Sequence, residues 1–162
     1  MEDLLVRLYD VPSLEEALAA TRSKGVTVRA ALGMDRAPVV NWVSSHFPGW
    51  KSETEVAFGR LPVSCFVAAR GEAIIGFACY DATCRNFLGP MGVAAEERER
   101  GIGRALLLAV LHAQRSQGYA YSIVGGVGPT EFYAKVVRAI PIPGSNPGIY
   151  GSRLSCSAPG SA

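Results

Sequence analysis

The stretch RERGIGR, residues 98–104, decides how we interpret this chain. It leads into the clearest amphipathic segment, which we expect to be a helix over residues 101–117. The first amide groups of a helix have no partner within it, and the helix dipole is positive at that end. Gly101 and Gly103 lack the Cβ atoms that would hold a ligand away from the backbone. The stretch therefore predicts an anion site, best suited to a phosphate or pyrophosphate.

Three phosphate-binding patterns compete for this stretch. A Walker loop needs a Lys-Ser or Lys-Thr pair after its last glycine, and none follows Gly103. A dinucleotide fingerprint, GxGxxG, needs a third glycine at position 106, which is Leu106. The pattern that fits is RxxGxG, formed by Arg98, Gly101 and Gly103. Simple helix capping by the two glycines is the structural alternative.

The hydrophobic pattern predicts a mixed α/β domain over residues 1–154, with a disordered tail at 155–162. We expect helices at 13–23, capped by Ser13, at 35–46, capped by Asp35, and at 101–117, with a fourth starting at 129. We expect strands at 4–8, 26–28, 63–68, 73–80, 86–93, 119–124, 139–142 and 149–154. Gly89-Pro90 interrupts the 86–93 strand, and proline there implies a bulge that frees backbone groups. Helices should cover both faces of one central sheet.

Composition excludes several classes of protein. The chain has 162 residues, 16 basic and 14 acidic, so its net charge of +2 favours neither nucleic acid nor membrane surfaces as a partner. Its four cysteines form no CxxC pair, and with two histidines they give no metal-ligand spacing. No apolar run reaches the ~20 residues of a membrane span, and the acidic start is unlike a signal peptide. We expect a cytoplasmic protein with reduced thiols and no metal.

Residues 91–107 and 131–135, the latter reading EFYAK, resemble two motifs of the GNAT superfamily of acyl-CoA-dependent N-acetyltransferases. The two stretches come in the family's order, and the resemblance spans roughly residues 60–150. It implies a GNAT-like α/β fold: a mainly antiparallel central sheet with a splayed strand pair and helices on both faces. It also implies acetyl-CoA as cosubstrate and an amine as acceptor.

The resemblance assigns roles to particular residues. The implied cofactor-binding residues are Met91, Gly92, Val93, Arg98, Glu99, Arg100, Gly101, Ile102, Gly103 and Arg104. Amides of 98–104 would hold the pyrophosphate, and the main chains of Met91 and Val93 would bond the pantetheine arm and the acetyl carbonyl. Tyr133 would protonate the departing thiolate. A phenol, with a pKa of about 10, keeps its proton at neutral pH and suits that role; packing beside Phe132 is the alternative.

Two positions depart from the family pattern. Gly126 stands where the family often has an asparagine, so that side-chain contact to the cofactor is lost. Arg138 stands where a glycine usually ends the second helix, so this helix end either needs a different cap or costs about 1 kcal/mol in the left-handed conformation. Both changes concern placement of the pantetheine arm and the acceptor, and neither touches the pyrophosphate loop.

The acceptor side is less defined by the sequence. We expect residues 33–60 to shape it, with an apolar wall, or else ordinary core packing, from Trp42, Phe47, Trp50 and Phe58. Trp50 is the residue we expect to face the acceptor, because it follows the helix-breaking Pro48-Gly49. The candidate bases, acting directly or through water, are His46, Glu53, Glu55 and Asp81; a water chain alone is the alternative.

These observations favour an N-acetyltransferase that acts on a primary amine of a small molecule or peptide. Direct attack in a ternary complex is expected, because no motif places a cysteine to carry the acyl group. A non-catalytic acyl-CoA-binding sensor or regulatory module is the alternative, and it would not need Tyr133. A nucleotide-binding module is disfavoured by the missing Walker and dinucleotide residues. Monomer and homodimer both stay open.

Overall fold

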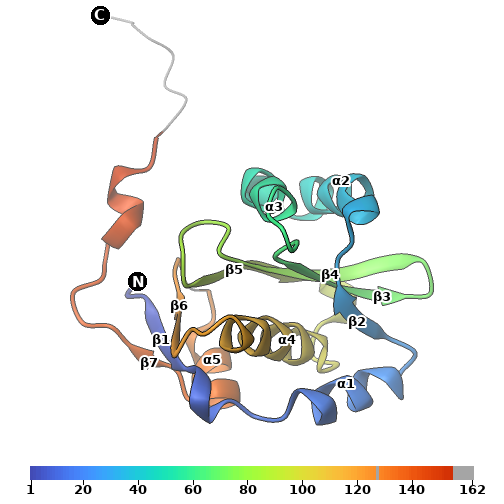
Figure 1. Cartoon of the computed structure of the whole chain (residues 1–162), viewed down its shortest axis with the longest axis horizontal. Helices are drawn as coiled ribbons and strands as arrows, with labels where there is room; N and C mark the ends of the chain where they lie inside the picture. Colours follow the sequence, from blue (N-terminus) through green and yellow to red (C-terminus); the bar gives the residue numbers. More distant parts are fainter. Residues whose placement is uncertain (127, 155–162) are drawn as a thin grey trace, which may run out of the picture.

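A seven-stranded sheet forms the centre of the molecule (Figure 1). The computed structural model describes residues 1–126 and 128–154, so the predicted disordered tail lies outside the described residues. The strand order is β2-β3-β4-β5-β6-β1-β7, and only the β5–β6 pair is parallel. The strands are β1 (Leu4–Arg7), β2 (Thr27–Ala30), β3 (Cys65–Arg70), β4 (Ala73–Tyr80), β5 (Phe87–Val93), β6 (Tyr121–Val124) and β7 (Ile140–Pro141).

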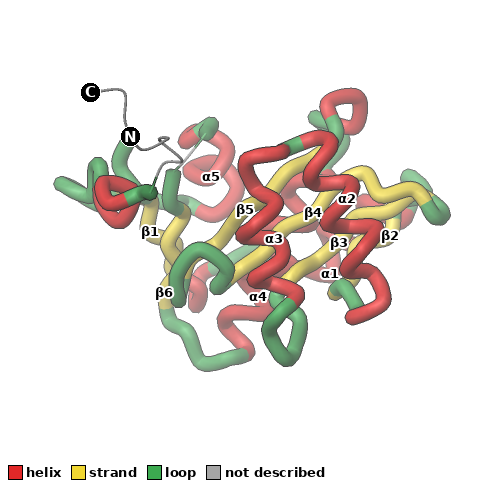
Figure 2. The backbone as a smooth tube through the Cα atoms, turned by 90° about the horizontal axis from the view of Figure 1, so that it is seen from above, coloured by secondary structure: helices red, strands yellow, loops and turns green. Residues whose placement is uncertain are grey.

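Helices cover both faces of the sheet, as predicted. One face carries α1 (Leu14–Arg22), α4 (Ile102–Ser116) and α5 (Thr130–Val137), and the other carries α2 (Arg36–His46) and α3 (Lys51–Phe58) (Figures 1 and 2). Each face has its own buried core, because each helix layer buries apolar side chains against the sheet. The core on the α4 face is the larger, and Leu106, Leu107 and Leu111 of α4 are fully buried in it.

Local signals in the sequence set several helix ends. The Ser13 hydroxyl accepts from the amide of Glu16 at 3.3 Å, which is the predicted cap of α1. Gly118, at φ +92°, follows the end of α4 in the left-handed conformation that glycine tolerates. Arg138 ends α5 at φ +53°, so the arginine adopts the left-handed conformation expected at that position.

The parallel pair of strands separates after two residues. β6 pairs with β5 only at Phe87↔Ile123 and Leu88↔Val124, and β6 then ends while β5 continues to Val93. The predicted bulge at Gly89-Pro90 lies at this point, opposite a register shift between Ala78 and Tyr80 of β4. The remaining half of β5 therefore has a sheet neighbour on its β4 side alone.

Three expectations from the sequence are wrong. Residues 149–154 are not a closing strand: Gly148–Ser152 forms a 3-10 turn, and its first glycine sits at φ +56°. The last strand of the described residues is β7, which lies at the edge of the sheet beside β1. Helix α3 was missed because its segment carries an apolar run only at 56–58. Asp35 does not cap α2; its carboxylate binds the Arg29 guanidinium, which lowers the pKa of Asp35.

Candidate active site

Helix α4 begins without a side-chain cap. Its N-cap residue is Gly101, at φ +85°, and no side chain of the described residues bonds to the amides there. The first helical bond runs from the Ala105 amide to the Gly101 carbonyl at 3.1 Å. The amides of Ile102, Gly103 and Arg104 therefore have no intrahelical partner. Uncapped amides at the positive end of a fifteen-residue helix fit an anionic group.

Gly103 marks the place where α5 and β5 meet the start of α4. A Cβ atom added at Gly103 would lie 3.7 Å from Cζ of Phe132 on α5 and 3.8 Å from Cγ2 of Val93 on β5. The three segments singled out in the sequence, 91–93, 98–104 and 131–135, therefore converge in the fold. Ordinary van der Waals distances also mean that a small side chain fits at this position without displacing its neighbours.

The free half of β5 presents main-chain groups to the gap between β5 and β6. The Ala94 amide donates to the Ile75 carbonyl at 2.9 Å, and the register pairs Gly92 with Phe77. Because hydrogen-bonded pairs alternate in an antiparallel ladder, Met91 and Val93 direct their amides and carbonyls away from β4. The Arg98 Nε also donates to the Val93 carbonyl at 3.4 Å. The gap thus has donors and acceptors along one wall.

Gly92 has a different environment from its two neighbours. It belongs to a hydrogen-bonded pair with β4, so its main chain faces that strand. A Cβ atom there would lie 2.7 Å from the ring of Phe47, which packs directly on β5 from the α2 side. Gly92 is therefore the position on β5 against which the Phe47 ring packs.

Tyr133 lies on α5, in the core on the α4 face. Its side chain is 8% exposed, and its ring packs edge-to-face on Phe132 with centroids 5.1 Å apart. Burial raises the pKa of Tyr133 to about 12. Within the described residues, the Tyr133 hydroxyl has no hydrogen-bond partner. Tyr133 is therefore protonated at neutral pH, with its hydroxyl not engaged by the protein.

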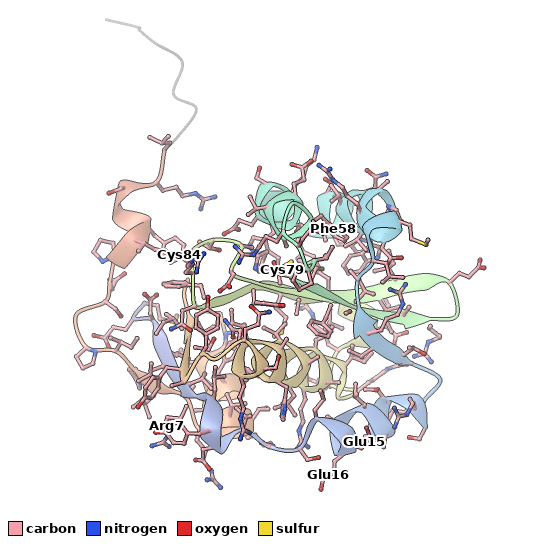
Figure 3. The ribbon with its side chains drawn as sticks, viewed as in Figure 1. Arg7, Glu15, Glu16, Phe58, Cys79 and Cys84 are labelled. Atoms are coloured by element: carbon pink, nitrogen blue, oxygen red, sulfur yellow. The ribbon has the colours of Figure 1, made fainter. Side chains whose placement is uncertain are left out.

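The opposite face of β5 and β4 carries an aromatic cluster. Phe47 stacks on Trp50 with centroids 4.9 Å apart, and the rings of Trp42 and Phe77 complete the group at 5.9 and 6.1 Å from Phe47. Trp42, Phe47 and Trp50 are half-buried. Phe58, by contrast, is buried between α3 and the sheet, near Cys79 (Figure 3). The cluster thus forms part of a core whose outer rings stay partly exposed.

The four candidate bases differ in their surroundings, and Glu55 is half-buried on α3. The Asp81 carboxylate is fully buried and accepts from the Asn86 amide at 2.7 Å, the Tyr119 hydroxyl at 3.0 Å and Arg60 at 3.4 Å. These bonds hold the β4–β5 loop, so they leave Asp81 a structural role. His46 is exposed, with its Nδ1 2.9 Å from the Trp42 carbonyl. The Glu53 carboxylate accepts from the Thr83 hydroxyl.

Sequence reasoning missed Tyr150, which lies where β5 and β6 separate. A Cβ atom at Gly125, just after β6, would lie 2.6 Å from the Tyr150 hydroxyl and 2.7 Å from the Phe87 ring. Burial raises the pKa of Tyr150, and the nearby Glu53 carboxylate raises it further. Glu53 of α3 accepts from the Thr83 hydroxyl in the β4–β5 loop, which leads into β5. The Gly125-Gly126 pair was the available signal, because adjacent glycines allow such close approach.

Comparison with known proteins gives a family match and a shared fold. Residues 62–136 match the family model described as the acetyltransferase (GNAT) domain. A GCN5-related glucosamine N-acetyltransferase region of a fungal multi-domain β-N-acetylglucosaminidase superposes with a TM-score of 0.72 at 18% identity, over 87% of this chain and 19% of that one. A GCN5-related N-acetyltransferase from Sphaerobacter thermophilus gives 0.67 at 20% identity, over 87% of this chain and 48% of that one.

A GNAT family acetyltransferase from Brucella melitensis, solved with acetyl-CoA, has a TM-score of 0.52 at 18% identity, over 68% of this chain and 80% of that one. No curated protein matches the sequence. By the family match, residues 62–136 form a GNAT acetyltransferase domain, and the chain shares the fold of the three structures above. It spans less than half the length of the first two structures above. Within the described residues, no helix is long and apolar enough to cross a membrane.

Proposed function

We propose that this protein transfers an acetyl group from acetyl-CoA to a primary amine of a small molecule or peptide, by direct attack in a ternary complex. The observation that carries the proposal is that the uncapped start of α4 lies next to the half of β5 whose main-chain groups face the gap between β5 and β6. A pyrophosphate fits the start of α4, and an extended amide-bearing arm fits the free edge of β5. The Brucella melitensis relative was solved with acetyl-CoA, which is consistent with this fit.

The amides of residues 102–104 would bind the pyrophosphate, and Gly101 and Gly103 keep side chains out of its way. The Met91 and Val93 main chains would bond the pantetheine arm as a neighbouring strand would, because they lack a β6 partner. Their amides are also the donors available to the thioester carbonyl oxygen, which gains negative charge when the amine attacks. Acetyl-CoA itself supplies an activated acyl group with a thiolate as leaving group.

Tyr133 would donate to that thiolate as the carbon–sulfur bond breaks. Transfer of a proton from a phenol of pKa about 12 to a thiolate whose acid has a pKa of about 8.5 is uphill by about 5 kcal/mol. Tyr133 therefore acts first as a hydrogen-bond donor that stabilises the developing charge, and proton transfer is completed late. A donor that stays protonated throughout the neutral range suits this task.

The acceptor would approach from the α2 and α3 side. Half-buried Trp50 and Phe47 offer an apolar surface next to β5, and Glu53 is bonded to Thr83 in the loop that leads into β5. An amine must lose a proton to attack a carbonyl carbon, and a carboxylate at that position would take it directly or through water. Among the candidate bases, Asp81 is held by three structural donors, so Glu53 fits this role best.

Calorimetry with acetyl-CoA tests the binding half of the proposal. In Gly103→Asp, a carboxylate would face the pyrophosphate, and affinity should fall at least tenfold, about 1.4 kcal/mol. Gly103→Ala is the matched control, because a methyl group has room there and should leave affinity within a few-fold. Equal affinity of the wild type and a folded Gly103→Asp variant would place the pyrophosphate elsewhere.

A panel of amines with thiol detection tests the catalytic half. Release of CoA that depends on an added amine, with the acetylated amine identified by mass spectrometry, is the expected result. Tight acetyl-CoA binding without turnover across the panel would instead favour the non-catalytic acyl-CoA-binding module.

A further inference from the structure

A cavity of about 140 Å³ lies between the start of α4, the end of α1 and the end of β3. Its lining residues are Thr21, Lys24, Val26, Arg70, Arg100 and Ile102. Three of these side chains are cationic and none is acidic. At about 30 Å³ for each water molecule, the cavity holds several waters, which is enough room for a tetrahedral phosphate group.

Two of the three cationic side chains, those of Lys24 and Arg70, are fixed by bonds to the main chain. The Lys24 Nζ donates to the Arg100 carbonyl at 3.0 Å, and the Arg70 Nη1 donates to the Lys24 carbonyl at 2.6 Å. These two bonds tie the end of α1 to β3 and to the loop before α4. A ligand would therefore meet cations that are already positioned, which lowers the entropic cost of binding.

Glu97 organises the two arginines without cancelling the charge. Its carboxylate accepts from the Arg70 Nη2 at 3.0 Å and from the Arg100 Nη1 at 3.4 Å. One carboxylate against Lys24, Arg70 and Arg100 leaves a formal charge of +2 around the cavity. Lysine has three donors and arginine five, so each cation keeps donors for a ligand. A doubly charged phosphomonoester matches this surplus.

Two lining residues, Arg100 and Ile102, also belong to the 98–104 loop. A pyrophosphate on this loop would therefore contact residues that also line the cavity, and a ribose phosphate attached to it would be within reach of the cavity. CoA carries such a group as the 3′-phosphate of its ribose. We propose that this cavity binds the 3′-phosphate of CoA, and that Lys24, contributed by the α1–β2 connection, makes the protein select CoA over its dephosphorylated form. This inference rests on the proposed function.

Calorimetry with CoA and 3′-dephospho-CoA tests the inference. The wild type should bind CoA at least tenfold more tightly than 3′-dephospho-CoA. Lys24→Gln should reduce that ratio at least threefold by weakening CoA alone, with the affinity for 3′-dephospho-CoA unchanged. Lys24→Arg, which keeps the charge, should restore most of the ratio. Arg22→Gln on the same helix is the matched control, because Arg22 pairs with Glu15 and does not line the cavity.

Equal affinities of the wild type for the two forms of CoA would overturn the inference and leave the proposed function intact. So would a folded Lys24→Gln variant with the wild-type ratio, or a loss of ratio in Arg22→Gln as large as in Lys24→Gln. Failure of both forms to bind the wild type would refute the cofactor site on which the proposed function depends. A melting curve for each variant separates loss of binding from loss of folding.

Discussion

Tyr133 has two properties that belong together: it is buried, and its hydroxyl is not engaged by the described residues. A tyrosine used only for packing fits the first property alone. The second is what a hydrogen-bond donor for a ligand requires. In the sequence, Tyr133 was predicted as the proton donor to the thiolate, and that role stays a prediction that kinetics can test.

Replacement of Tyr133 by phenylalanine removes one hydroxyl and keeps the packing on Phe132. Because general acid catalysis is typically worth about 10²–10⁴-fold, kcat should fall by that factor. The dissociation constant of acetyl-CoA should change less than threefold, because the proposed binding site is the 98–104 loop and β5. Steady-state kinetics and calorimetry measure the two quantities. A variant as fast as the wild type would leave Tyr133 a packing residue.

The raised pKa of Tyr133 also predicts how stability depends on pH. Below about pH 10 the tyrosine is neutral in the folded and unfolded states. Between about pH 10 and the folded pKa of about 12, the unfolded state loses its proton first, so the free energy of unfolding falls as pH rises. From pH 9 to pH 11 this loss is about 1.4 kcal/mol. Denaturant unfolding at a series of pH values gives the free energy of unfolding against pH for the wild type and Tyr133→Phe. The free energy should fall more steeply with pH in the wild type, and equal pH dependence of the two proteins would contradict the prediction.

At the scale of elements, the sequence predicts best where one signal acts alone. The α4 pattern and its RxxGxG start predicted a helix with an uncapped beginning, because apolar spacing and glycine chemistry are local properties. The bulge at Gly89-Pro90 was equally local. The place of β1 between β6 and β7 was not predictable in this way, because pairing between distant strands leaves no trace in either strand's own pattern.

The candidate site shows the same division. The segments 91–93, 98–104 and 131–135 were found by pattern, and the fold brings them together at Gly103. Tyr150 and the pairing of Glu53 with Thr83 were missed, because both depend on segments that are distant in sequence. Asp81 was proposed as a base from its residue type alone. Its three donors become visible only in the folded loop.

The β4–β5 loop should depend on Asp81 for stability. Asp81→Ala would leave the Asn86 amide and the Tyr119 hydroxyl without their acceptor and would break the pair with Arg60. Since Arg60 is 35% exposed and stays hydrated, we expect a loss of about 3 kcal/mol in the free energy of unfolding. Denaturant unfolding measures it, with exposed Asp10→Ala as control. A stable but inactive Asp81→Ala variant would make Asp81 a catalytic base after all.

At the scale of the whole molecule, the proposed cofactor site and the proposed acceptor site lie on opposite faces of the sheet. The α4 and α5 layer meets the cofactor loop and Tyr133, and the α2 and α3 layer holds the aromatic cluster and Glu53 (Figure 2). The gap between β5 and β6 connects the two faces through the sheet. A change confined to α3 should therefore alter use of the acceptor without altering binding of acetyl-CoA.

Two glutamates on α3 allow this separation to be tested. Glu53 and Glu55 are two positions apart on a helix with 3.6 residues per turn, so they point in different directions. Glu53 bonds Thr83 and lies near Tyr150, whereas the Glu55 carboxylate has no ion pair within the described residues. If Glu53 takes the proton of the amine, Glu53→Gln should lower kcat at least tenfold at pH 7. Higher pH should recover part of the rate, because the free amine becomes more abundant.

Glu55→Gln should keep the wild-type rate, and both variants should keep the wild-type affinity for acetyl-CoA in calorimetry. Equal rates for the two variants, or a loss of acetyl-CoA affinity in Glu53→Gln, would show that proton removal does not reside on α3 and that a water chain serves the amine instead.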